Sequence, residues 1–420
     1  MSATGSALAE RAGGYGVALT CGEMDQWQHN VLFADELSPA FAASGVPLKR
    51  LDYRAQPRDV YRALNDADCA FFLCFNGFGS ELQVSEPELR ASRAQPKPGC
   101  FRSAYEYFHK PLFDLMHDCP AHESMEHQVE SLFSRRNLLL TDYGYVGMAK
   151  TLGVRHARFV PSIAFPTTLP GPPRPMRARS IEILLPLGFQ DPEVSRRRYV
   201  DTSYRGRVYR VIFEAVVEAC VANLRLDPLH EVLAACQDAG LEFDPRDPDS
   251  RFLLTTALDF VKFARRQRLV RAVAHLPVSI MSRAPFEEGT PGCRLRPIQT
   301  RSASEMLAAI AETRCVICPL PHMTGYHERA LGAFTAGAAV VASPNHILET
   351  EFNHGQGVLI YQSELELVDI LEKTLASPDW LEPIAARGRE RALARFSPLR
   401  LAETILSLLS SEPALHVARG

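Results

Sequence analysis

Residues that could bind phosphate lie where the sequence predicts a buried strand followed by a helix. The first amide groups of a helix have no partners within it and carry partial positive charge, so they stabilise a bound anion. Gly325 permits close approach of the backbone, and His327 and Arg329 add donors, of which a planar guanidinium suits phosphate oxygens. The segment therefore favours binding of a diphosphate, and its candidate residues are Gly325, Tyr326, His327, Glu328 and Arg329.

The same segment also has a structural interpretation. His327 and Arg329 could cap and solvate the helix, with Glu328 as the ion-pair partner of both. If both residues were fully helical, their side chains would point roughly 200° apart around the helix axis. At most one of them could then face a diphosphate, unless the helix begins near His327. Periodicity alone leaves both interpretations open.

A second set of polar residues follows predicted strands in the first half of the chain. Asp118 and His122 lie in the segment HDCPAHE, and Glu23 and Asp25 lie in CGEMDQ after the first strand. A carboxylate or imidazole in such a loop can take a proton from a reacting hydroxyl group. We expect Asp118, with His117 beside it, to be the first candidate for a general base. The alternative is that all of these are ordinary loop and cap residues.

The same loop raises the question of a metal site, because imidazole and carboxylate groups are suitable ligands. The candidates would be His117, Asp118, His122 and His127, but a separation of five residues on a helix turns the direction by about 140°. We therefore expect no metal ion. The pair in Cys315–Cys318 lies in a strand-like run without a second pair at zinc-ribbon spacing, so we expect buried thiols there.

Short apolar runs alternate with helical patterns along the first half. Such alternation predicts a parallel sheet with helices on both faces. The expected strands span residues 15–20, 48–53, 69–75, 111–118, 137–142 and 157–165, with helices near 29–43 and 57–65.

The second half begins after a segment with five prolines, which stiffen the chain and remove hydrogen-bond donors. A strand at 181–188 precedes a mostly helical region up to about Ala274, and the alternation then resumes. The basic runs 196–198 and 265–268 are interpreted as solvated helix faces. The later strands are expected near residues 277–282, 294–299, 315–320, 338–343 and 358–363.

These patterns predict two α/β domains. We expect a disordered leader at 1–14, an N-terminal domain at 15–165, a Pro-rich linker at 166–180, a C-terminal domain at 181–395, and a C-terminal helix and tail at 396–420.

Composition excludes several classes of protein. Of 420 residues, 46% are hydrophobic and 23% are charged, which is typical of a globular protein. A net charge of -3 argues against nucleic acid as a partner. No apolar run reaches the roughly 18 residues of a membrane-spanning helix, and the first residues lack the features of a secretion signal. We expect a cytoplasmic protein, with peripheral contact to a membrane left open.

The segment GYHERALGAFTAGAAVVASPN, residues 325–345, resembles the C-terminal signature of group 1 type glycosyltransferases. It is most similar to the spore-maturation (CgeB-like) branch, and the looser similarity covers about residues 283–408. The segments KPLFDLMHDCPAHES and TDYGYVGMAKTLGVRHARFVPSIAF resemble the acceptor-side domain of such proteins less specifically.

The resemblance implies a GT-B fold, with two Rossmann-like, doubly wound parallel-sheet domains facing across a cleft and a C-terminal helix returning to the N-terminal domain. It implies that the C-terminal domain binds a nucleotide-sugar such as a UDP-sugar, through Gly325, His327 and Arg329. The acceptor would be a saccharide, protein or other cell component. No cofactor is implied besides the nucleotide-sugar substrate, and no metal requirement.

One feature departs from the family. Retaining enzymes of this fold commonly have two glutamates eight residues apart, and alignment on ALGAFTAG places Thr324 and Gly332 at these positions. A non-catalytic protein that binds a nucleotide-sugar, or a scaffold, is therefore the alternative. A Rossmann-type oxidoreductase is disfavoured, because CGEMDQ follows the first strand in place of GxGxxG.

Overall fold

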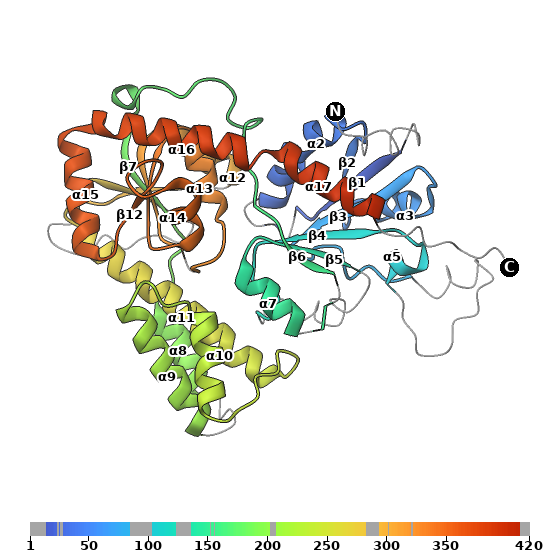
Figure 1. Cartoon of the computed structure of the whole chain (residues 1–420), viewed down its shortest axis with the longest axis horizontal. Helices are drawn as coiled ribbons and strands as arrows, with labels where there is room; N and C mark the ends of the chain where they lie inside the picture. Colours follow the sequence, from blue (N-terminus) through green and yellow to red (C-terminus); the bar gives the residue numbers. More distant parts are fainter. Residues whose placement is uncertain are drawn as a thin grey trace.

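Each half of the chain forms a six-stranded parallel sheet in the computed structural model (Figure 1). The structure describes residues 14–22, 25, 28–84, 103–122, 136–151, 153–154, 156–201, 207–282, 294–300, 302–320 and 322–411. Glu23, His127, nearly all of the expected leader, and the end of the expected tail lie outside these residues.

The first sheet has the strand order β2-β1-β3-β4-β5-β6. Its central strand β3 consists only of apolar residues, as expected for a parallel strand that is covered on both faces. The strands are β1 (Tyr15–Thr20), β2 (Leu48–Asp52), β3 (Cys69–Phe75), β4 (Leu112–Met116), β5 (Asn137–Leu140) and β6 (Ala157–Phe159), and the helices are α2 (His29–Ala43), α3 (Pro57–Asn65), α5 (Ala104–Tyr107) and α7 (Tyr143–Thr151).

The second sheet has the order β12-β11-β10-β7-β8-β9. Its strands are β7 (Ile181–Pro186), β8 (Val278–Met281), β9 (Arg296–Ile298), β10 (Thr313–Cys318), β11 (Ala339–Ala342) and β12 (Leu359–Ile360). Its helices are α12 (Ala303–Ala311), α13 (Glu328–Thr335), α14 (His346–Phe352), α15 (Glu364–Ala376) and α16 (Glu382–Arg395). Each sheet and the helices around it form one lobe. The last helix, α17 (Pro398–Ser411), crosses from the second lobe to the first, where it packs on α2 (Figure 1). These two sheets confirm the expected alternation, although most strands are shorter than expected.

Four helices are inserted between β7 and β8. They form the green and yellow bundle at the bottom of Figure 1 and are α8 (Pro192–Asp201), α9 (Arg207–Ala222), α10 (Pro228–Asp238) and α11 (Pro248–Val273). Their apolar faces share one core with β4, β5 and α7 of the first lobe. The insertion therefore packs against the N-terminal half although it belongs to the C-terminal half in sequence.

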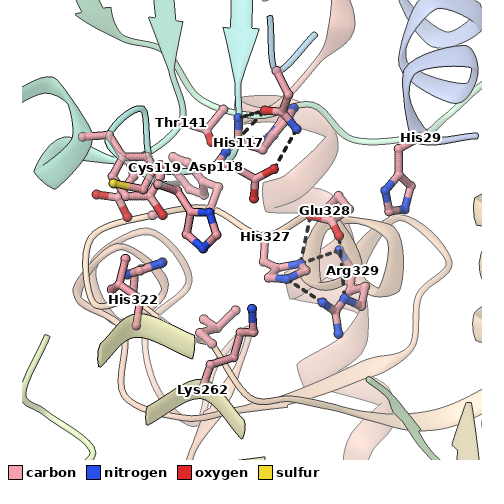
Figure 2. A pocket seen from close by; sticks show the side chains of 18 of the residues that line it. His29, His117, Asp118, Cys119, Thr141, Lys262, His322, His327, Glu328 and Arg329 are labelled. Carbon is pink, nitrogen blue, oxygen red and sulfur yellow. Dashed lines mark hydrogen bonds and ion pairs between the residues drawn. The ribbon is translucent and has the colours of Figure 1, made fainter. Parts of the chain in front are cut away.

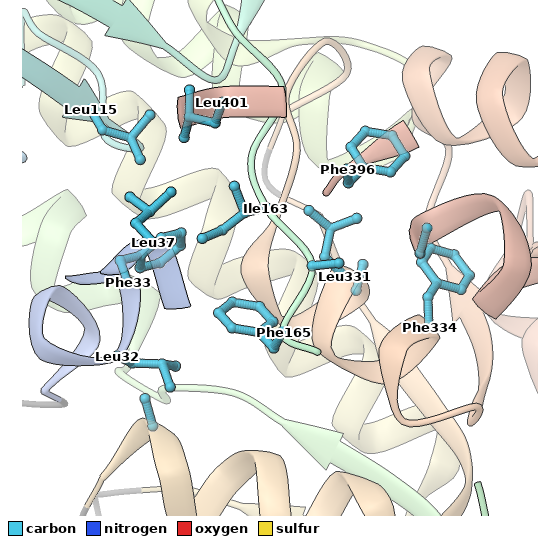
Figure 3. Packing of buried hydrophobic residues seen from close by; sticks show 14 of the residues in the cluster. Leu32, Phe33, Leu37, Leu115, Ile163, Phe165, Leu331, Phe334, Phe396 and Leu401 are labelled. Carbon is cyan, nitrogen blue, oxygen red and sulfur yellow. The ribbon is translucent and has the colours of Figure 1, made fainter. Parts of the chain in front are cut away.

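A second shared core joins the two lobes directly (Figure 3). Phe33 of α2 lies 5.6 Å from Phe165, measured between ring centroids. The backbone amide of Phe165 donates to the hydroxyl of Thr335 in α13. Residues 162–165 of the connection between the sheets are thus buried between a helix of each lobe, whereas the Pro-rich part that follows is mostly exposed.

The expectation of solvated helix faces is wrong for part of the run 265–268. The guanidinium of Arg265 donates to the carbonyl groups of Cys220, Asn223 and Leu226 just after and within the end of α9. Arg266 is only 6% exposed. Both side chains are turned inward, Arg265 toward the end of α9 and Arg266 toward the residues after β7. Among the described helices, none is long and apolar enough to cross a membrane.

Candidate functional site

A cavity of about 560 Å³ lies between the two sheets, at the carboxyl ends of their strands. Ligands of open α/β sheets bind at such edges, and the volume falls within the usual range for ligand pockets. Figure 2 shows His117 and Asp118 on one side of the cavity and His327, Glu328 and Arg329 on the other. The first pair follows β4 and the second group opens α13, so each lobe supplies one wall.

His327 is the N-cap residue of α13 and joins a compact polar cluster. Its Nδ1 lies 2.9 Å from a carboxylate oxygen of Glu328, and its Nε2 lies 2.8 Å from the guanidinium of Arg329. A guanidinium can only donate, so Nε2 accepts and the ring is neutral, while Nδ1 lies between the carboxylate of Glu328 and the backbone amide of Arg329, which is 3.3 Å away. Burial and the nearby Arg329 lower the pKa of His327, which agrees with this neutral form.

Arg329 is held by several neighbours. Besides His327, its guanidinium donates to the carbonyl oxygen of Pro186 at the end of β7 and lies 3.6 Å from Glu328. Burial opposes ionisation of Glu328, but the adjacent His327 and Arg329 outweigh it and hold the pKa of Glu328 well below its usual range. Both interpretations of the sequence therefore apply. His327 is the N-cap residue of α13, and His327, Glu328 and Arg329 also line the cavity.

The helix α11 adds two cations to this wall. Lys262 lies 2.7 Å from Asp259, and Arg266 donates to the carbonyl oxygen of Gly188 at 2.7 Å. Burial and the proximity of Arg329 lower the pKa of Arg266 to about 9. Among the described residues, no carboxylate lies within ion-pair distance of Arg266. A buried guanidinium in this state is strongly stabilised by any anion that binds beside it.

Asp118 forms the opposite wall and is exposed to the cavity. The side-chain amide of Asn76, after β3, donates to its carboxylate at 3.0 Å. His117, next to it, is largely covered, and its ring lies 4.7 Å from the ring of Phe33. Burial lowers the pKa of His117 to about 4, so the imidazole is neutral near pH 7.

A loop of the second lobe closes the cavity against the first. Thr324 donates to the carboxylate of Asp142 at 2.8 Å, and the amide of Tyr326 donates to the carbonyl oxygen of Thr141 at 3.1 Å. A Cβ atom on Gly325 would lie 2.4 Å from the same carboxylate. The close approach that Gly325 permits is therefore one between the two lobes, at the edge of the cavity.

The inserted helices also contact the loop that carries Thr324 and Gly325. Asp227 at the start of α10 accepts from the amide of Met323 at 2.9 Å and lies 3.8 Å from His322. Although burial opposes both charges, this pairing raises the pKa of His322 and lowers the pKa of Asp227 to about 2. The loop is thus tied to β5 on one side and to α10 on the other.

The candidate bases lie in different surroundings. Asp118 and His122 line the cavity, and His122 lies 3.7 Å from Asp259. Asp25 is buried away from the cavity lining, and its two carboxylate oxygens accept from the amides of His29 and Asn30 at the start of α2. The structure thus brings Asp118 and His122, but not Asp25, to the same space as Gly325, Tyr326, His327, Glu328 and Arg329.

A smaller cavity of about 330 Å³ adjoins the first and shares His29, Lys262, Arg266, Glu328 and Arg329 with it. Its far side is mostly apolar and comes from the ends of β7, β8 and β9 and from α12, through Leu187, Phe189, Met281, Thr300 and Met306. A ligand with a central anionic group could therefore reach both cavities.

Sequence reasoning did not identify Asn76, Lys262 or Arg266. Lys262 and Arg266 are four residues apart, which places them on one face of a helix. Asn76 precedes Gly77 directly after an apolar strand, and this pair is typical of a left-handed turn. Both signals were present, but nothing local says that the helix face is buried or that the turn meets Asp118.

Thr324 and Gly332 stand at the two positions that align with the glutamates of retaining enzymes. A Cβ atom on Gly332 would lie 2.5 Å from the side chain of Leu307 in α12, so a larger residue could not fit without movement. The hydroxyl of Thr324 is bound to Asp142, as described above. Within the described part of the chain, no group of three or more His, Cys, Asp or Glu residues could hold a metal ion.

Residues 265–407 match a protein-family model described as glycosyl transferase-like. The match lies within the C-terminal half and includes Arg266 and the whole of α13. No curated protein gives a significant match to the chain.

Among solved structures, sucrose-phosphate synthase from Thermosynechococcus elongatus aligns over 94% of this chain and 98% of that chain, with a TM-score of 0.50 and 12% sequence identity. Anabaena HepE in complex with UDP and glucose aligns over 95% of this chain and 100% of that chain, with a TM-score of 0.47 and 12% identity. The chain thus has the GT-B fold that its sequence predicts, and residues 265–407 are similar to the glycosyl transferase-like family.

Proposed function

We propose that this protein is a glycosyltransferase that moves a sugar from a nucleotide-sugar, such as a UDP-sugar, to an acceptor hydroxyl on a saccharide, protein or other cell component. The family match, the fold and the cavity between the lobes support this proposal. Metal independence, a cytoplasmic location and membership of the CgeB-like branch stay predictions from the sequence.

The observation that carries the proposal is the state of Arg266. The two carboxylates that act on it are already bound, Asp259 to Lys262 and Glu328 to His327. The wall between the two cavities therefore holds a buried positive charge that has no carboxylate within ion-pair distance among the described residues. A diphosphate placed there would gain charge-assisted hydrogen bonds from Arg266 and Arg329.

The two cavities suggest how a donor would lie. The diphosphate would rest against α11 and the first turn of α13, where the guanidinium groups of Arg266 and Arg329 line both cavities. The nucleoside would occupy the smaller cavity, near Met281 and Met306, and the sugar would project into the larger one, toward Asp118. This placement gives every wall of the two cavities a function in binding.

The transfer itself would be a single displacement. The acceptor oxygen forms a bond to the anomeric carbon while the bond from that carbon to the diphosphate oxygen breaks, and its electrons pass to the diphosphate. The proton of the acceptor passes to Asp118 as general base. The positive charge of Arg266 and Arg329 stabilises the leaving group, and a single displacement inverts the anomeric centre.

A binding experiment tests the donor site. We would measure binding of a panel of nucleotide-sugars and of free UDP by calorimetry to the wild type, Arg266→Ala and Arg271→Ala. Arg271 is an exposed residue in the last turn of the same helix and serves as the matched control. A charge-assisted hydrogen bond contributes about 1.5–3 kcal/mol to binding. Its loss in Arg266→Ala should therefore raise the Kd for the donor roughly 10- to 150-fold.

The outcome separates the proposal from its alternatives. Unchanged affinity in a folded Arg266→Ala variant would show that the diphosphate does not bind at this wall. Tight donor binding by the wild type, without transfer or slow hydrolysis of the donor, would instead indicate a non-catalytic nucleotide-sugar-binding protein. Because Thr324 and Gly332 stand where retaining enzymes commonly have glutamates, transfer and donor hydrolysis by the wild type should be measured first.

A further inference from the structure

Asn76 adopts an unusual backbone conformation directly after β3. Its φ angle is 48°, and Gly77 follows with a φ of 73°. Left-handed residues other than glycine are disfavoured because Cβ approaches the carbonyl oxygen, although asparagine tolerates the conformation better than most residues. Among the described residues, only Gln28, His109 and Asn353 share this feature. The chain thus keeps a side chain at a position where glycine would be less strained.

The side chain of Asn76 contacts the loop that carries Asp118 through both of its polar atoms. Its carbonyl oxygen accepts from the backbone amides of His117 and Asp118, at 2.7 and 3.3 Å. Its amide nitrogen donates to the carboxylate of Asp118 at 3.0 Å. In the opposite orientation, the NH2 group of Asn76 would face the two backbone amides and its oxygen would face the carboxylate of Asp118. Only the observed orientation therefore satisfies the contacts.

We infer that Asn76 is a positioning residue for the reaction: its side-chain amide fixes the carboxylate of Asp118 at the edge of the cavity. This inference rests on the proposed function. A carboxylate that accepts a hydrogen bond is favoured in its charged form, which is the form that takes a proton. The same contact restricts rotation of a side chain that is otherwise exposed to the cavity.

The turn at Asn76 has supports that do not involve its side chain. The backbone amide of Asn76 donates to the carbonyl oxygen of Leu115, and the amide of Gly77 donates to the buried carboxylate of Asp114 at 2.9 Å. These contacts keep the end of β3 joined to β4 if the side chain is removed. A glycine at residue 76 should therefore keep the turn and lose the side-chain contacts to the loop of Asp118.

Several charged or titratable groups surround Asp118 and set the background for its ionisation. They come from its own loop, from α2, the end of β5, α7, the inserted helix α11, the loop before α13 and α13 itself, and they are His117, Cys119, His122, His29, Asp142, Tyr145, Asp259, Lys262, Arg266, His322, Tyr326, His327, Glu328 and Arg329. The same residues are present in every Asn76 variant. A change in the titration of Asp118 between Asn76 variants therefore reports on residue 76.

The test compares Asn76→Gly and Asn76→Asp with the wild type. Asn76→Gly removes the donor, so the acidic limb of the pH profile of kcat should move to higher pH. Asn76→Asp keeps the acceptor oxygen but places a second carboxylate about 3 Å from Asp118, so the limb should move further, on the order of one pH unit or more. In both variants kcat at neutral pH should fall while KM for the donor stays unchanged, because the donor contacts the other wall.

A second measurement keeps this test independent of the activity. Protein labelled with ¹³C at the aspartate carboxyl groups would be titrated by NMR, with Asp118→Asn identifying the resonance of Asp118. Its midpoint should rise in the order wild type, Asn76→Gly, Asn76→Asp. Equal midpoints in the three folded proteins would overturn the inference even if the enzyme transfers sugar. An inactive wild type with the expected order of midpoints would contradict the proposed function and leave the role of Asn76 in positioning Asp118 standing.

Discussion

His117 shows how one buried residue couples the site to the stability of the whole protein. Its ring lies against Phe33, and its Nδ1 lies 3.4 Å from the hydroxyl of Thr141. Burial lowers its pKa from 6.5 to about 4. Between these values the unfolded chain binds a proton that the folded protein does not bind. The contribution of His117 to the free energy of unfolding is therefore fully present above pH 6.5 and decreases as the pH falls toward 4.

The prediction at this residue is a change in the pH dependence of unfolding. Each pH unit in the window costs about 1.4 kcal/mol, so the wild type should lose about 2 kcal/mol between pH 7.5 and 5.0 that His117→Gln does not lose. Urea denaturation at the two pH values measures the difference. His275→Gln is the control, because that side chain is 55% exposed and should keep the slope of the wild type. Equal slopes for all three proteins would contradict the prediction.

The residues at Thr324 and Gly332 show what a sequence can and cannot say about a site. Their identities depart from the glutamates of the resembling family, and this was visible from the alignment alone. The reason at Gly332 is not visible there, because it is the side chain of Leu307, from another helix, that occupies the space. The ribose of the proposed donor would therefore be held by groups other than glutamates at these two positions.

At the scale of elements, most strands and helices could be predicted because they follow local patterns. The apolar run at Cys69–Phe75 forms β3, and the helix over His29–Ala43 forms despite Pro39. The position of the inserted helices could not be predicted, because periodicity shows which face is apolar but not which partner covers it. Arg266 was misread for this reason.

Asp25 illustrates an element that depends on one side chain. Gln28, the N-cap residue of α2, makes no side-chain hydrogen bond to the helix, and Asp25 accepts from the amides of His29 and Asn30 instead. The carboxylate also complements the positive end of the helix. Asp25 therefore anchors the helix that carries His29 and Phe33 to the cavity.

The prediction for this helix compares two substitutions. Asp25→Ala leaves two helix amides without their acceptor and should lower the free energy of unfolding by about 1–2 kcal/mol, as for other lost caps. Asp25→Asn keeps one of the two acceptor oxygens and turns an NH2 group toward the other amide, so it should cost at least half as much. Urea denaturation at pH 7.5 measures both. An unchanged free energy of unfolding in Asp25→Ala would contradict this role of Asp25.

At the scale of the whole molecule, two cores cross the boundary between the lobes. One joins α2, Phe165 and α13, and the other joins α7 to the inserted helices. Chains of this size often unfold domain by domain. Here the separation of either lobe would expose apolar surface on both, so the lobes should stabilise each other. We therefore expect the walls of the cavity to stay together in the folded chain.

The last prediction follows from this coupling: the described lobes should unfold in one transition, and Phe165→Ala should shift that transition without splitting it. Phe165 is 1% exposed and contacts both lobes, so its truncation should cost about 3–5 kcal/mol. Differential scanning calorimetry measures the number of transitions, and Leu365→Ala, at a side chain that is 79% exposed, is the control. Two separate transitions, of which only one moves in Phe165→Ala, would show that the lobes fold independently and that the cavity walls can separate.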